Sequence, residues 1–116
     1  MLKARLNAAR SVATALLPAE ADLEAAIAST ANLVGTIVGA RREAGVAISV
    51  AQDALAELGD TLQGLIRARG TMASAHAALA GNRIELGLRA HAMGDVSDCP
   101  PASASLSLVT DDRAVA

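Results

Sequence analysis

The segment ISVAQDALAELGDTLQGLIRARGTMASAHAALAGNRIEL, residues 48–86, decides the fold. At alternating steps of three and four residues it places one row of mostly apolar side chains: Ile48, Ala51, Leu55, Leu58, Leu62, Leu65, Arg69, Met72, His76, Leu79, Arg83 and Leu86. Such a heptad row predicts a helix that packs lengthwise against another helix, as in a coiled coil. Burying one leucine is worth about 1.5–3 kcal/mol, so we expect the four consecutive leucines of this row at the centre of the core.

The composition restricts how the core can be built. The chain has 116 residues, a length typical of one domain, and it contains no Phe, Tyr or Trp, while roughly a quarter of it is alanine. Aromatic side chains supply much of the burial in small cores and interfaces, and this chain lacks them. We therefore expect stabilisation by close helix contacts and by self-association.

Proline, glycine and capping residues predict four helices, over residues 2–17, 18–44, 49–69 and 71–92. We expect these helices to form one helical domain, residues 1–93. Pro18 predicts the first boundary, because proline ends helices and suits their first turn. Ser49 has the spacing of a capping box, and Gly70 followed by Thr71 predicts the last break. Two all-α architectures remain open: an up-and-down four-helix bundle, and a long helical hairpin in which residues 49–88 form one rod.

The second predicted helix carries a ridge of small residues, Ala31, Gly35 and Gly39. Small residues let two helix backbones approach closely, so we expect this ridge to make the closest helix contact. The surrounding apolar stretch, residues 25–40, also allows a second interpretation as a membrane-active helix. It is shorter than the ~20 apolar residues that a membrane span needs, which makes a membrane partner the weaker hypothesis.

Charged residues indicate how the helices on either side of Gly45 align. We expect Gly45 to cap the second helix, with the chain reversing direction there. Such a hairpin places Glu24 level with Arg67 and Asp22 level with Arg69. Opposite charges then meet at the far end, which supports an antiparallel arrangement, although each exposed pair contributes only tenths of a kcal/mol.

Residues 94–116 differ in composition from the helical domain. Pro100 and Pro101 exclude a helix there, and the residues from Ser103 to Thr110 alternate in a pattern typical of a short strand. We expect this extended tail to dock on a neighbouring subunit through Leu106 and Leu108.

The sequence lacks the patterns that would indicate catalysis or cofactor binding. His76 and His91 have no Cys, Asp or Glu at metal-ligand spacing, and Cys99 has neither a partner thiol nor a basic neighbour. Phosphate-binding and nucleophile-elbow motifs are missing. We expect a non-enzyme without cofactor, metal or catalytic residues.

These observations favour a structural or adaptor protein that associates with copies of itself, or with another helical protein, in a shell, filament or virion. The first alternative is the membrane-active protein described above. The second is a helical regulator that binds nucleic acid through Arg67, Arg69, Arg83 and Arg89, which the net charge of −2 disfavours. We expect a cytoplasmic location or a soluble assembly, without a cleaved signal peptide, because the apolar patch from Val12 to Leu17 is short.

Overall fold

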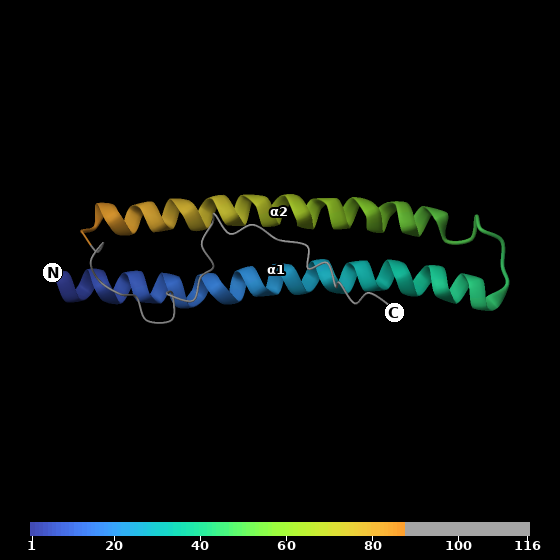
Figure 1. The fold of residues 1–116 in the computed structure, drawn as a ribbon, viewed down its shortest axis with the longest axis horizontal. Helices are drawn as coiled ribbons and strands as arrows, with labels where there is room; N and C mark the ends of the chain where they lie inside the picture. The colour runs from blue at the N-terminus through green and yellow to red at the C-terminus, as the bar shows by residue number, and fades with distance from the viewer. Residues whose placement is uncertain (88–116) are drawn as a thin grey trace, which may run out of the picture.

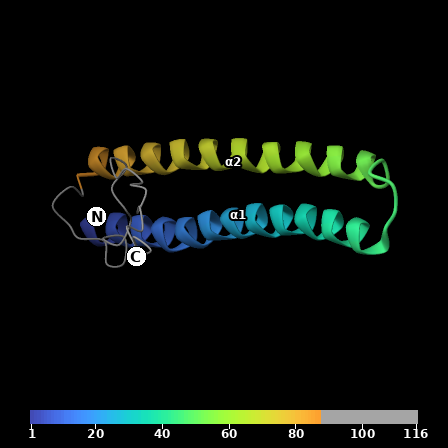
Figure 2. The ribbon, with the colours of Figure 1, turned by 45° about the vertical axis from the view of Figure 1, so that its right-hand side comes forward.

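The protein folds into an antiparallel hairpin of two long helices (Figure 1). The computed structural model describes residues 1–87. Helix α1 spans Leu2–Ala44 and helix α2 spans Gln52–Glu85, and residues 45–51 connect them. At 1.5 Å per residue α1 is about 65 Å long. A second view, turned by 45°, shows the two helices again next to each other, so they lie side by side along most of their length (Figure 2).

The all-α prediction and the hairpin alternative are confirmed, and the four-helix bundle is wrong. The helices expected over residues 2–17 and 18–44 form one helix, α1. Those expected over 49–69 and 71–92 are joined in α2, which begins at Gln52 and ends at Glu85. Residues 94–116, for which an extended tail was expected, lie outside the described residues.

Pro18 lies inside α1 without ending it. Proline at this position removes one N–H that would otherwise bond the carbonyl of Thr14. Both residues are exposed, so water can hydrate that carbonyl. The cost is confined to one turn, while the seam residues on either side, Leu16 and Leu23, pack towards α2.

Gly70 and Thr71 likewise continue a helix that they were expected to break. The hydroxyl of Thr71 donates to the carbonyl of Ala68 at 2.9 Å, so it bonds within the helix and does not cap a new one. A Cβ added at Gly70 would meet no atom within 4 Å, which shows that this glycine serves no close approach between α1 and α2. Its cost is the ordinary one of glycine in a helix, up to about 1 kcal/mol.

The turn has one predicted cap and one that sequence reasoning placed wrongly. Gly45 caps α1 in the left-handed conformation, with φ 66°, and its N–H donates to the carbonyl of Arg42 at 3.2 Å. Val46 donates to the carbonyl of Arg41 at 3.4 Å, which completes a Schellman motif. By contrast, α2 begins after Ala51, with φ 67° and no side-chain cap, so the capping box at Ser49 does not form.

The heptad pattern sets which sides of the helices face each other. In α1 the half-buried residues include a row at steps of three and four: Leu6, Ala9, Ala13, Leu16, Glu20, Leu23, Ile27, Thr30, Val34, Ile37 and Arg41. In α2 the matching half-buried row is Leu55, Leu58, Leu62, Leu65, Met72, His76 and Arg83. None of the described residues is fully buried, so the hairpin has a packed seam without an enclosed core.

Candidate helix-association surfaces

The four leucines singled out from the sequence lie on the seam. Leu55, Leu58, Leu62 and Leu65 are all half-buried, on the side of α2 that packs against α1. Ile48, the first residue of the predicted row, lies in the turn and is 82% exposed. The seam therefore begins at Ala51, and its leucines keep part of their apolar surface uncovered by the single chain.

The small-residue ridge lies away from the seam. Ala31, Gly35 and Gly39 are exposed, and a Cβ at either glycine would meet no atom within 4 Å. The ridge therefore does not make the contact between α1 and α2. Contact of this ridge with another chain stays a prediction.

Two polar contacts join the helices and show which residues of α1 and α2 lie level. Nε of Arg69 donates to Oε1 of Glu24 at 2.8 Å, and both side chains are 60% exposed. Nδ1 of His76 lies 2.6 Å from Oε1 of Glu20, where the side chains are about 30% exposed. Because a carboxylate accepts hydrogen bonds, Nδ1 carries the proton in this contact.

The observed register differs from the expected one. Glu24 was placed beside Arg67 and Asp22 beside Arg69, whereas Glu24 pairs with Arg69. Asp22 and Arg67 form no ion pair among residues 1–87. The reason is the length of the connection, which extends from Gly45 to Ala51, so the chain reverses near Ile48 and not at Gly45. Each residue of α1 therefore lies opposite an α2 residue that is closer to the C-terminus than expected. The contact between Glu20 and His76 follows from this shift, and allowing for a longer turn would have predicted it.

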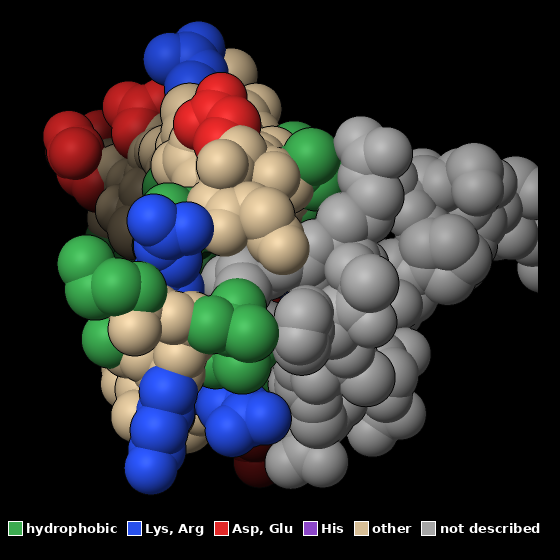
Figure 3. Space-filling view, turned by 90° about the vertical axis from the view of Figure 1, so that its left-hand side faces the viewer, with side chains coloured by type: hydrophobic (Ala, Val, Ile, Leu, Met, Phe, Trp, Pro, Cys, Tyr) green, Lys and Arg blue, Asp and Glu red, His purple; other side chains and the backbone are tan. Residues whose placement is uncertain are grey.

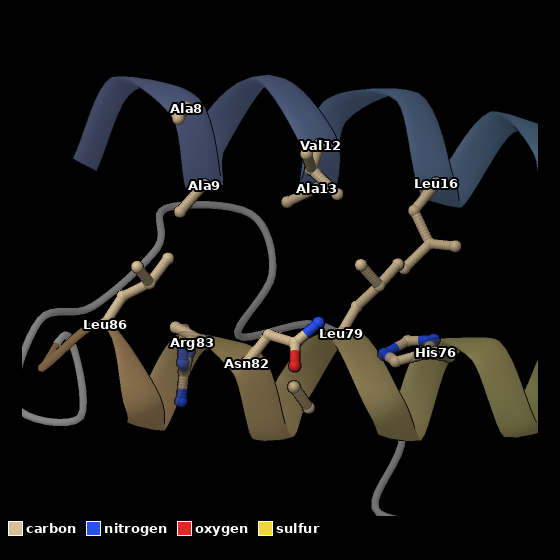
Figure 4. Close-up of a pocket in the computed structure, with 11 residues that line it drawn as sticks. Ala8, Ala9, Val12, Ala13, Leu16, His76, Leu79, Asn82, Arg83 and Leu86 are labelled. Atoms are coloured by element: carbon tan, nitrogen blue, oxygen red, sulfur yellow. The ribbon is translucent and has the colours of Figure 1, made fainter. Parts of the chain in front are cut away.

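A groove opens between the helices near the N-terminus of α1 and the C-terminus of α2. It has a volume of about 360 Å³, and its lining is mostly apolar: Ala8, Ala9, Val12, Ala13, Leu16, His76, Leu79, Ala80, Asn82, Arg83 and Leu86. Leu16 and Leu79 point towards each other from opposite helices, while the alanines of α1 are too short to fill the remaining space (Figure 4). The groove thus results from alanine on the α1 side of the seam facing larger residues of α2.

Arg83 is a charged residue on this apolar seam. It is half-buried, and its Nε is fully buried and has no hydrogen-bond partner in the described part of the chain. A buried donor without an acceptor costs about 1–3 kcal/mol. The end of the hairpin that carries the N-terminus also presents Lys and Arg side chains beside hydrophobic ones (Figure 3).

The remaining predicted positions do not form one surface. Of the arginines proposed for nucleic-acid contact, Arg67 is exposed, Arg69 is paired with Glu24, and Arg83 lines the groove. The fourth, Arg89, lies outside the described residues. Leu106, Leu108, His91 and Cys99 lie outside them too. Within residues 1–87 no group of three His, Cys, Asp or Glu side chains is placed to hold a metal ion.

Large apolar side chains are exposed on the flanks of both helices. On α1 they include Val12, Leu33 and Val38, and on α2 they include Ile66 and Ile84, with exposed fractions from 39% to 54%. Helix α1 is also long and apolar enough to cross a membrane, with a mean hydropathy of 1.3 over 18 residues. The apolar stretch at 25–40 therefore belongs to a longer continuous helix than the sequence predicted.

In comparisons with known proteins, no family model, no curated protein and no solved structure matches the chain.

Proposed function

We propose that this protein is a self-associating helical subunit, whose work is to pack against copies of itself in a larger protein assembly. The single observation that carries the proposal is that none of the described residues is fully buried. A seam of half-buried leucines leaves the apolar contribution of each well below the 1.5–3 kcal/mol of a buried one. Further helices laid against this seam and its flanks would supply the rest.

The exposed flanks support the same proposal. Leu33 and Ile66 belong to different helices and are 46% and 54% exposed. Helices in bundles carry apolar residues at the seam and on one flank, because each helix packs against more than one neighbour. A hairpin with apolar flanks is half of a four-helix bundle, which a second hairpin would complete.

Thermal unfolding at several protein concentrations, followed by far-UV circular dichroism, tests this proposal. Folding that is coupled to association has a midpoint that rises with protein concentration. We expect the midpoint to rise by several degrees over a hundredfold increase in concentration. A midpoint independent of concentration would contradict the proposal.

The second candidate is membrane association through α1, and the length and mean hydropathy of that helix favour it. Glu20, Asp22 and Glu24 in the middle of α1, and the polar residues after them, oppose it, because charges inside a bilayer cost several kcal/mol. Phase separation in a mild detergent distinguishes the two functions. The assembly proposal expects the protein in the aqueous phase, and recovery in the detergent phase would favour the membrane.

A further inference from the structure

The groove beside Arg83 combines two features that restrict what can fill it. Its walls are apolar, with Val12 and Leu79 still 45% and 36% exposed. The buried Nε of Arg83 is a hydrogen-bond donor without an acceptor. A fitting occupant therefore brings apolar side chains together with a hydrogen-bond acceptor, and a carboxylate is the strongest acceptor for a guanidinium group.

The charge of this end of the hairpin favours an acidic occupant. Lys3, Arg5 and Arg10 lie in the first three turns of α1, and Arg83 lies opposite them on α2. Glu85 is the one acid among the described residues before Glu20 on α1 and after His76 on α2, and Glu20 itself is paired with His76 at the inner end of the groove. An anionic segment is attracted here, and a cationic one is repelled.

One stretch of the same chain has this chemistry. Residues 106–112 read Leu-Ser-Leu-Val-Thr-Asp-Asp, so Leu106 and Leu108 share one side of an extended segment and two carboxylates follow. No cation lies between Ser103 and Asp112; Arg113 follows, so the two aspartates and this arginine leave residues 106–113 with a net charge of −1. Within residues 88–116 this is the one place where alternate leucines are followed by two acids.

The connection is long enough for the segment to return to its own hairpin. The groove begins at Leu86, one residue before the last described residue, Gly87, and extends back to His76, a length of about 15 Å along α2. Residues 88–105 can span roughly 60 Å when extended. A tethered segment also has an effective concentration near the millimolar range, which favours binding within one chain.

We propose that residues 106–112 bind in this groove of their own chain, with Leu106 and Leu108 on the apolar walls and an aspartate, Asp111 or Asp112, accepting from Arg83. This intramolecular docking uses the groove and leaves Leu33, Val38 and Ile66 exposed for other chains. It does not depend on the proposed self-association, because one chain supplies both groove and segment.

A spin label beside the segment tests the proposal in the full chain. Cys99 is the one cysteine, so Cys99→Ser with Ser105→Cys gives a single labelling site next to Leu106. We expect the nitroxide to reduce the methyl signals of Val12 and Leu16 more than twofold relative to the reduced label, while Val46 and Val50 at the turn stay unchanged. Equal attenuation at both ends, or none at the groove, would overturn the proposal.

Two matched variants separate docking from nonspecific proximity. Leu108→Asp adds a charge on the side that faces the groove, and Ser107→Asp adds the same charge on the opposite side. We expect Leu108→Asp to abolish the attenuation and Ser107→Asp to keep it. Equal effects of the two variants would contradict the proposed orientation.

A mixed sample identifies which chain supplies the segment. Isotope-labelled chains without nitroxide are mixed with unlabelled chains that carry it. Docking within one chain predicts much weaker attenuation at Val12 in this mixture than in the doubly labelled chain, because associated chains carry the nitroxide on a neighbouring subunit and not in the groove of the observed chain. Attenuation in the mixture as strong as in the doubly labelled chain would show exchange between subunits and overturn intramolecular docking, whereas the mass of the protein would still report on self-association separately.

Discussion

His76 of α2 donates from Nδ1 to Oε1 of Glu20 of α1 across 2.6 Å, and this contact joins residues 56 positions apart in the sequence. Both side chains are about 30% exposed, so the contact is partly shielded from water. It lies on the same row as the leucines of the seam, where an apolar pair would be expected. The pair contributes to the observed register, since a shift by one heptad would place His76 opposite Ala13 or Ile27, where its ring has no carboxylate to bond.

Replacing Glu20 tests that relationship. We expect Glu20→Ala to lower the free energy of unfolding by about 1 kcal/mol, the net value of a partly shielded hydrogen bond. Urea denaturation followed by circular dichroism measures it. The control is Glu24→Ala, whose ion pair with Arg69 is 60% exposed and should be worth less than about 0.5 kcal/mol. Equal losses would show that the contact between Glu20 and His76 does not fix the register.

Replacing Pro18 measures how much a proline inside α1 lowers the free energy of unfolding. We expect Pro18→Ala to raise the free energy of unfolding by about 1–3 kcal/mol, because alanine restores the N–H that bonds the carbonyl of Thr14. Thermal and urea unfolding measure the gain. A variant no more stable than the natural chain would mean that the helix is locally rearranged at this proline.

Two glycines give a matched pair with opposite expected signs. Gly70 lies inside α2 with open space around it, so Gly70→Ala should stabilise by about 0.5–1 kcal/mol. Gly45 has φ +66° at the cap of α1, so Gly45→Ala should destabilise by about 1 kcal/mol or more. Urea denaturation of both variants checks the pair. Destabilisation by Gly70→Ala would indicate that another chain packs closely against this glycine.

The sequence predicted the architecture correctly where the same apolar pattern repeats over many residues. The heptad row from Ala51 to Arg83 predicted a long helix with its apolar side correctly placed, because many residues contribute to it. Pro18 and Gly70 were overestimated as breaks, since each costs one helix a few kcal/mol at most, and packing along the seam outweighs that.

The candidate groove could not be predicted from the same pattern. It depends on which residues of α1 stand opposite Leu79 and Arg83, and the level of the two helices is set by a turn of seven residues that carries weak local signals. The register expected from the sequence was wrong by a few residues, so the predicted ion pairs joined residues that do not pair in the structure. The groove and the contact between Glu20 and His76 both follow once the reversal is placed near Ile48.

Truncation of a seam leucine separates an isolated hairpin from an assembled one. In a single hairpin Leu62 is half-buried, so Leu62→Ala should cost about 1 kcal/mol. In the proposed assembly further helices cover the seam, and the expected loss is about 2–5 kcal/mol per chain. Chemical denaturation at high protein concentration measures it, with Ile48→Ala in the exposed turn as a control that should stay within about 0.5 kcal/mol.

The central claim is that the hairpin associates with copies of itself, and the mass of the full chain in solution without detergent tests it most directly. Light scattering with refractive-index detection suits a chain that has no aromatic residues and hence little ultraviolet absorbance. One chain has a mass of 11.6 kDa. We expect a defined mass of at least twice that value at micromolar concentration. A mass of 11.6 kDa for a folded protein at every concentration reached would contradict the account.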